Sequence, residues 1–177
     1  MIDHASLDKM VKRVRLLVLD VDGVMTDGSI WLSGGDEFKR FHVKDGAAIK
    51  YLQRAGIAVA IITGRQSEAV SRRAGELNIH ECLQGCLKKL PHYLELLARL
   101  GLKEEETACM GDDLPDLPLF NHCCLKIATS DAAVEVRERA DIVTAMPGGN
   151  GAIREAAEIL LKGQGKWQTL VEGYLGE

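Results

Sequence analysis

Short apolar segments alternate along the chain with longer segments in which apolar residues recur with helical period. The short segments predict strands at residues 15–19, 57–62, 107–110, 125–128 and 141–143. The longer segments predict helices at residues 45–55, 67–77, 88–100, 114–120, 132–139 and 151–161. Strands that alternate with helices in this way are typical of α/β folds, and we expect a Rossmann-like, doubly wound parallel sheet.

One segment departs from this alternation, directly after the first predicted strand. Residues 29–32 and 37–41 have the composition of two short strands, and the turn-forming run Ser-Gly-Gly-Asp at 33–36 joins them. A β-hairpin should therefore project from the domain at this point. Neither this hairpin nor the strand and helix expected between Thr63 and Lys89 is long enough to form a cap domain.

The 177 residues contain no internal repeat, low-complexity tract or proline-rich linker, which predicts one domain over residues 1–177. The last part, from about residue 164 to residue 177, carries glycines first and apolar residues afterwards. We expect this part to be a flexible tail. A helix docked on its own subunit fits the same composition equally well.

Composition excludes several classes of protein. With 46% hydrophobic and 27% charged residues, the chain has the make-up of a globular domain. The net charge is −4, and the Lys and Arg residues are scattered along the chain, which disfavours a nucleic-acid partner.

The N-terminal segment and the cysteines indicate where the protein is found. Residues 1–15 are polar and the apolar run 16–19 is too short for a signal peptide or a membrane span, so we expect a cytoplasmic protein without a membrane partner. Five cysteines without framework or zinc spacing predict free thiols.

Two carboxylates stand directly after the first predicted strand, in the run DVDGVMTDG that begins at Asp20. The carboxyl ends of strands border the ligand crevice of an open α/β sheet, so Asp20 and Asp22 are candidate active-site residues. Carboxylates this close repel each other unless a cation lies nearby, and their oxygens favour Mg²⁺. Asp20 can attack phosphorus to form an aspartyl-phosphate. Asp22 can protonate the leaving alcohol and later activate water.

Two further polar groups have the placement of phosphate-binding residues. Thr63 and the backbone at Gly64 follow the second predicted sheet strand and can hold phosphate oxygens. Lys88 and Lys89 stand at the start of a predicted helix, where a lysine and the helix terminus together can bind an anion. One of these lysines is expected to stabilise the transferred charge.

A third acidic cluster follows the predicted strand at 107–110. Asp112 can complete the Mg²⁺ site, with Asp113 or Asp116 in support. Each feature has an ordinary explanation when it is taken alone, because aspartates cap helices, Thr-Gly pairs form turns and surface lysines are solvated. Four polar clusters in this order predict an active site.

These residues resemble the pattern of the haloacid dehalogenase superfamily, whose phosphatases carry a DxD motif, a later threonine, a lysine and a GDxxxD motif in this order. Within it, the chain resembles the capless subfamily of 3-deoxy-D-manno-octulosonate 8-phosphate phosphatases along nearly its whole length. The matching runs are DVDGVMTDG, FHVKDG, TGR, QGxxxK, GDDLPD and GGNGAIRE. The resemblance implies a single Mg²⁺-dependent phosphatase domain that acts on a small sugar-acid phosphate.

The resemblance also implies roles for particular residues. It selects Lys89 over Lys88 as the catalytic lysine, and it assigns the backbone carbonyl of Asp22 to the metal beside Asp20 and Asp112. The residues expected to line or support the substrate side are Lys44, Asp45, Gly64, Arg65 and Arg154. In this family four subunits pack through their hairpins and a neighbour's C-terminal tail can close over the active site, which implies a homotetramer here.

The expected reaction is hydrolysis of 3-deoxy-D-manno-octulosonate 8-phosphate in lipopolysaccharide precursor synthesis. The alternative substrate is a nonulosonate 9-phosphate related to sialic acid. A phospho-acceptor signalling domain also groups acidic residues, Thr and Lys around Mg²⁺, but its phosphorylated aspartate follows the third strand, whereas Asp20 follows the first. An inactive scaffold would have little use for the complete set of groups.

Overall fold

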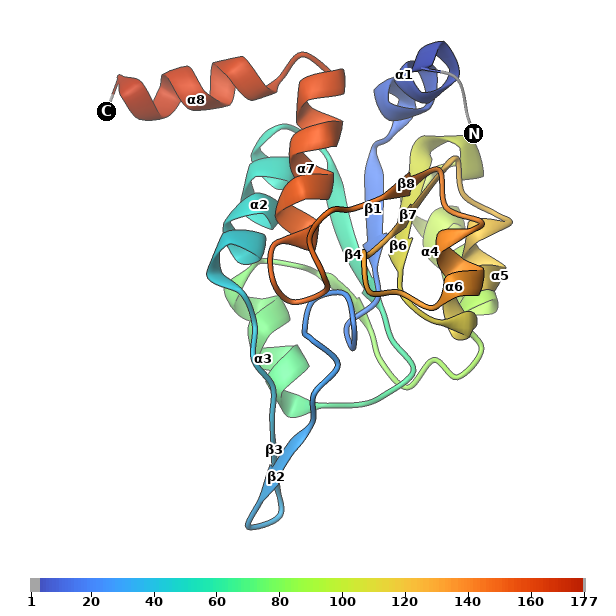
Figure 1. Cartoon of the computed structure of the whole chain (residues 1–177), viewed down its shortest axis with the longest axis vertical. Coiled ribbons are helices and arrows are strands. Elements are labelled where there is room, and N and C mark those ends of the chain that lie inside the picture. The colour runs from blue at the N-terminus through green and yellow to red at the C-terminus, as the bar shows by residue number, and fades with distance from the viewer. Residues whose placement is uncertain (1–3, 177) are drawn as a thin grey trace.

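The computed structural model describes residues 4–176, which form a central parallel sheet with helices on both faces (Figure 1). The six strands lie in the order β5-β4-β1-β6-β7-β8, and all neighbouring pairs are parallel. Their bounds are β1 Leu16–Leu19, β4 Ala58–Ile62, β5 Glu81–Leu83, β6 Thr107–Gly111, β7 Leu125–Ala128 and β8 Ile142–Val143. The predicted α/β fold class is confirmed. The five sheet strands predicted by residue range are present within one residue at either end, whereas the two hairpin strands predicted at 29–32 and 37–41 are shorter, at 31–33 and 36–38.

The predicted helices are also present, with one division. The helices are α1 His4–Arg13, α2 Val43–Arg54, α3 Glu68–Glu76, α4 Lys89–Leu100, α5 Leu117–Phe120, α6 Val134–Arg137, α7 Ala152–Gly163 and α8 Trp167–Leu175. The segment predicted as one helix over 114–120 is a 3₁₀ turn, Leu114–Asp116, followed by α5. Pro118 has no N–H to donate to the carbonyl of Leu114, so a continuous α-helix cannot form there.

Helix α1 is absent from the predicted set because most of its residues are polar. Its apolar residues Leu7, Met10 and Val11, together with Val14 directly after its end, nevertheless follow helical spacing at i, i+3, i+4 and i+7. Val11 and Val14 are buried in the core beside α7. This periodicity is the signal from which the helix can be predicted.

The central strand β1 is buried on both faces. Leu17 and Leu19 pack in the core that includes residues of α2, α3 and α7, and Leu16 and Val18 pack in the core that includes residues of α4, α5 and α6. Figure 1 shows these two groups of helices on opposite sides of the sheet. Burial of each such side chain contributes about 1.5–3 kcal/mol. The strand that precedes Asp20 is therefore held firmly from both sides.

The predicted hairpin projects from the domain as a separate two-stranded sheet (Figure 1). Its strands are β2 Trp31–Ser33 and β3 Asp36–Phe38, with Trp31 opposite Phe38. Gly34 and Gly35 have φ values of 60° and 91°, which are the left-handed values that a tight hairpin turn requires. Between Asp20 and Thr63 the chain forms the hairpin, α2 and the sheet strand β4, and none of them is a cap domain.

Helix α8 lies outside the layers and contacts α2 and α7. The ring of Tyr51 is 6.4 Å from that of Trp167 and 5.9 Å from that of Tyr174. The tail therefore forms a helix docked on its own subunit, which is one of the two expectations. The flexibility of the tail stays a prediction. Residue 177 lies outside the described range. Among residues 4–176, no helix is both long and apolar enough to span a bilayer.

Candidate active site

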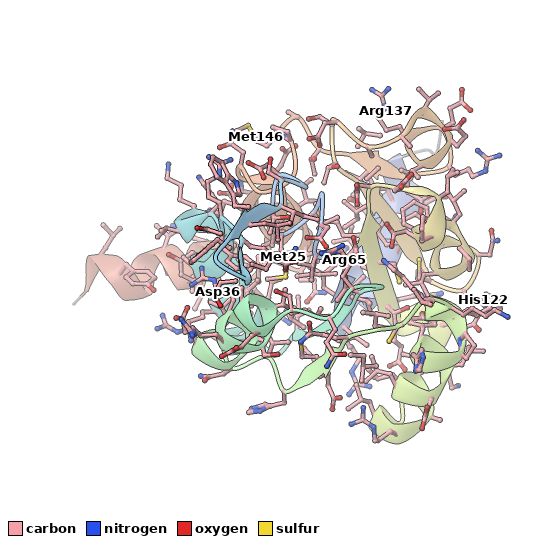
Figure 2. The ribbon with its side chains drawn as sticks, turned by 90° about the horizontal axis from the view of Figure 1, so that it is seen from below. Met25, Asp36, Arg65, His122, Arg137 and Met146 are labelled. Carbon is pink, nitrogen blue, oxygen red and sulfur yellow. The ribbon has the colours of Figure 1, made fainter. Side chains whose placement is uncertain are left out.

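Three candidate residues stand at the carboxyl ends of neighbouring strands. Asp20 follows β1, Thr63 follows β4 and Asp112 follows β6. The chain runs from β1 through β4 to β5 and then returns to β6 on the other side of β1. The strand order therefore reverses at β1, which is where open α/β sheets bind ligands. Figure 2 views this edge of the molecule, with Met25 and Arg65 near the centre.

Lys89 joins two of the predicted acidic residues. Its Nζ lies 2.7 Å from Asp20 Oδ1 and 2.5 Å from Asp116 Oδ1, and its side chain is buried. Burial alone would lower the pKa of Lys89, but Asp20 and Asp116 raise it overall, so the lysine stays a cation. Lys88 is exposed at the N-cap of α4. The structure therefore brings Lys89 to Asp20, and not Lys88.

Asp116 is engaged through both of its carboxylate oxygens. Oδ1 accepts the hydrogen bond from Lys89, and Oδ2 accepts from the N–H groups of Asp112 (3.0 Å) and Asp113 (3.3 Å). Asp113 is exposed, and its own carboxylate accepts from the N–H of Leu114. Asp116 thus holds the loop after β6 against Lys89, whereas Asp113 caps the following 3₁₀ turn.

The carboxylates of Asp20, Asp112 and Asp116 fit a divalent cation, because each offers an oxygen within 4.8 Å of the others. Asp112 Oδ1 is buried and has no hydrogen-bond partner among the described residues. Burial, Asp20 and Asp116 raise the pKa of Asp112 to about 8. Burial and Asp116 raise the pKa of Asp20 to about 6 against the opposing effect of Lys89. A hard cation such as Mg²⁺ would relieve this crowding of negative charge.

Asp22 lies in a second charged cluster that includes the hairpin. Lys39 Nζ is 2.5 Å from Asp22 Oδ1, and Arg65 Nε is 3.6 Å from Asp22 Oδ2. Glu37 Oε2 accepts a 2.6 Å hydrogen bond from Arg65. Lys39 and Glu37 are functional candidates that the sequence reasoning missed. Their spacing of two places them on one side of a strand, but the sequence does not tell which side faces Asp22.

The phosphate-binding candidate Thr63 is buried at the end of β4. Its N–H donates to the carbonyl of Leu83 at 3.0 Å, and its own carbonyl accepts from the N–H of Cys86 at 2.9 Å. These bonds tie the start of the Thr63-Gly64 loop to the end of β5. The loop is therefore fixed beside Asp20, on the strand that neighbours β1.

The remaining substrate-side candidates lie at different places. Asp45 is buried and accepts from the N–H groups of Gly151 (3.0 Å) and Arg154 (2.8 Å), so it supports the start of α7. The guanidinium of Arg154 lies over the rings of Tyr51 and Trp167, and the structure does not bring it to the acidic cluster. Lys44 is exposed on the first turn of α2.

A groove of about 610 Å³ runs between the hairpin and α3 and meets the site at Glu37 and Lys39. Arg72 and Arg73 of α3 line it together with Glu68 and Glu76, with which they form ion pairs. The sequence reasoning did not select these two arginines. None of Asp20, Lys89 and Asp112 lines this groove, so it lies beside the acidic cluster and not over it.

Comparison with known proteins matches residues 84–155 to the model of the haloacid dehalogenase-like hydrolase family. A relative that spans most of the chain is the 3-deoxy-D-manno-octulosonate 8-phosphate phosphatase KdsC of Escherichia coli (strain K12). It is 43% identical over 163 residues, which cover 92% of this chain and 87% of the relative. This match includes all three strand ends described above.

Two solved structures share the fold over nearly the whole chain. The probable YrbI family phosphatase of Pseudomonas syringae pv. phaseolica has a TM-score of 0.94 at 42% identity, covering 97% of this chain and 98% of the other. The 3-deoxy-D-manno-octulosonate 8-phosphate phosphatase of Moraxella catarrhalis, solved with a magnesium ion, a phosphate ion and a KDO molecule, has a TM-score of 0.94 at 36% identity, covering 97% and 99%.

Proposed function

The chain belongs to the family of 3-deoxy-D-manno-octulosonate 8-phosphate phosphatases, within the haloacid dehalogenase-like hydrolases, and we propose that it hydrolyses the phosphate ester of that eight-carbon sugar acid. One catalytic domain over residues 1–177 carries this activity. The observation that supports it most directly is the contact of Lys89 with both Asp20 and Asp116 at the point where the strand order reverses. This is the arrangement that a phosphoryl-transfer site needs.

Mg²⁺ is the proposed cofactor, held by the carboxylates of Asp20 and Asp112 and by the backbone carbonyl of Asp22. Support comes from the unpartnered Oδ1 of Asp112 and the crowding of acidic groups. When bound, Mg²⁺ neutralises negative charge in the site and so permits an anionic phosphate to approach Asp20. Asp116 and Asp113 act indirectly, through the loop that positions Asp112.

Asp20 is the proposed nucleophile. Its carboxylate forms a bond to phosphorus as the bond from phosphorus to the leaving oxygen breaks. Lys89 is hydrogen-bonded to Asp20, so it orients that carboxylate and supplies positive charge to the transferred group. The hydroxyl of Thr63 and the backbone at Gly64 hold phosphate oxygens from the neighbouring strand end.

Asp22 is the proposed general acid and base. It gives a proton to the leaving alcohol, and its carboxylate then takes a proton from the water that attacks the phosphorylated Asp20. The second step releases inorganic phosphate and restores the free aspartate. Arg65, whose Nε lies 3.6 Å from Asp22 Oδ2, is the proposed cation for the anionic part of the substrate.

Assembly into a homotetramer through the hairpins is part of the proposal. The hairpin exposes large apolar side chains, with Trp31 65%, Leu32 77% and Phe38 53% exposed. Apolar residues gathered in this way on a projecting element mark an interaction surface. In such an assembly a neighbour's C-terminal tail would screen the site. A cytoplasmic location and a role in lipopolysaccharide precursor synthesis follow from the family and belong to the same proposal.

The test is phosphate release in the presence of Mg²⁺ from a panel of substrates. The panel contains 3-deoxy-D-manno-octulosonate 8-phosphate, nonulosonate 9-phosphates, hexose phosphates and 4-nitrophenyl phosphate. We expect a strong preference for the first compound in kcat/KM. A preference for nonulosonate 9-phosphates would overturn the proposed substrate and support the alternative one. Absence of all activity would overturn the phosphatase proposal.

A further inference from the structure

We propose that Lys39, on the projecting hairpin, is the positioning residue for the acid/base carboxylate of Asp22. The inference rests on the proposed function, because it assigns a part in the same reaction. One juxtaposition carries it: the Nζ of Lys39 lies 2.5 Å from Asp22 Oδ1, and the Lys39 side chain is completely covered.

The hairpin geometry explains how Lys39 reaches Asp22. Side chains alternate along a strand, so Glu37 and Lys39 lie on one side of β3 and its extension, and Phe38 lies on the other. Phe38 is exposed, whereas Glu37 contacts Arg65 and Lys39 contacts Asp22. The same short strand therefore presents an apolar side chain to the outside and a cation to Asp22.

The contact fixes one oxygen of Asp22 and leaves the other available. A carboxylate rotates easily about its last side-chain torsion, so a single strong donor is enough to set its plane. Lys39 holds Oδ1. Arg65 Nε is 3.6 Å from Oδ2, which is beyond hydrogen-bond distance. Oδ2 is thus the oxygen that can exchange a proton with the leaving alcohol and with water.

Lys39 is itself fixed by a neighbouring carboxylate. Glu37 Oε1 lies 3.5 Å from Lys39 Nζ, and Glu37 Oε2 accepts a hydrogen bond from Arg65. A covered lysine requires such partners, because an unpaired buried charge costs several kcal/mol, on the order of 3–5. In the reaction, the proton on Asp22 Oδ2 passes to the leaving oxygen while Lys39 keeps its hydrogen bond to Oδ1.

The experiment compares aryl phosphates whose leaving groups differ in basicity but have the same ring. Full-length wild type, Lys39→Met and Lys39→Arg are assayed with Mg²⁺ on a series from phenyl phosphate to 4-nitrophenyl phosphate. A poor leaving group needs the proton from Asp22, whereas 4-nitrophenolate leaves without it. We expect Lys39→Met to lower kcat/KM about 10-fold or more for phenyl phosphate, but less than about threefold for 4-nitrophenyl phosphate.

Two variants serve as controls. Lys39→Arg retains a cationic donor and should restore most of the wild-type dependence on leaving group. Arg40→Met removes the adjacent hairpin cation, which pairs with Asp27 in an exposed position, and should behave as wild type. If Lys39→Met does not fold, Lys39→Ala, which also removes the donor, takes its place in the series with the same expected result.

The outcomes separate this inference from the proposed function. An active enzyme in which the Lys39 variant loses the same factor on every leaving group overturns the positioning role, because a merely structural defect affects all substrates alike. A wild-type protein that releases no phosphate from any ester, including the sugar-acid phosphates, overturns the proposed function and this inference with it.

Discussion

A side chain at position 23 would collide with Asp112. A Cβ built on Gly23 lies 2.1 Å from Asp112 Oδ2, and Gly23 has a left-handed φ of 98°. The loop after β1 therefore passes so close to the carboxylate after β6 that only glycine fits between them. This close approach brings Asp20, which follows β1, and Asp112, which follows β6, to one site although they are far apart in the sequence.

Gly23→Ala should weaken metal binding. The new Cβ must push the Asp112 carboxylate aside, and the left-handed backbone adds strain of about 1–3 kcal/mol. We expect the Mg²⁺ concentration for half-maximal activity to rise about 10- to 100-fold. Gly28→Ala is the matched control, because φ is 76° there but the nearest atom to its Cβ is 3.8 Å away. An equal effect of both variants would mean that strain alone is responsible.

Asp20→Asn should abolish turnover without unfolding the protein. The amide keeps the volume of the carboxylate but cannot form the phospho-enzyme. Lys89 keeps its second partner, Asp116, so the buried cation stays paired. The measurement is phosphate release together with a thermal melt, and Asp8→Asn, in an exposed position on α1, is the control. Retained turnover in a protein that still binds Mg²⁺ would contradict the nucleophile assignment.

Asp116→Asn should lower kcat more than Asp113→Asn. An amide at 116 must turn its NH₂ group either toward Lys89 or toward the N–H groups of the loop, and both are donors. We expect a loss of about 10- to 100-fold at Asp116 and a smaller one at exposed Asp113, where the amide oxygen can still accept from Leu114. Steady-state kinetics at saturating Mg²⁺ measure the difference. Equal losses of kcat would contradict the assignment of Asp116 as the support of the metal site and of Asp113 as a turn cap.

The metal-free protein should lose stability as pH rises. The folded-state pKa values of Asp112, about 8, and Asp20, about 6, lie above the ordinary value of 3.8. Between about pH 4 and about pH 8 the folded state therefore binds more protons than the unfolded state, and the free energy of unfolding falls with increasing pH. Mg²⁺ replaces these protons. With a chelator present, the Tm should fall as the pH rises from about 4 to about 8. The increase in Tm on adding Mg²⁺ should become larger over the same range. An increase that does not change with pH would contradict the electrostatic account.

Deletion of residues 165–177 should affect the sugar-acid phosphate more than a small aryl phosphate. A tail that screens a neighbour's site matters most for the substrate that fills the groove. The deletion also removes the contacts of Trp167 and Tyr174 with Tyr51. Trp167→Ala, which loosens this docking but keeps the tail, is therefore the control. The readout is kcat/KM for both esters, and equal losses would indicate destabilisation instead of screening.

Much of the active-site arrangement could be predicted from local pattern. Asp20, Thr63 and Asp112 each follow a short apolar strand, and parallel strands place such residues at one edge. The amphipathic spacing of α1 was present but was hidden among polar residues. The division of the predicted helix at 114–120 follows from Pro118, whose effect on a helix can be predicted from the sequence. These features depend on neighbours close in the chain.

The sequence by itself determined the α/β fold class, the hairpin and the polar groups that follow each strand, because periodicity and turn chemistry act locally. The tertiary structure alone decided which groups meet. It placed Lys39 against Asp22 and turned Arg154 toward Tyr51 and Trp167, because the side that a strand or helix presents depends on the packing of distant elements. It also produced the raised pKa of Asp112, since burial beside Asp20 and Asp116 exists only in the folded chain.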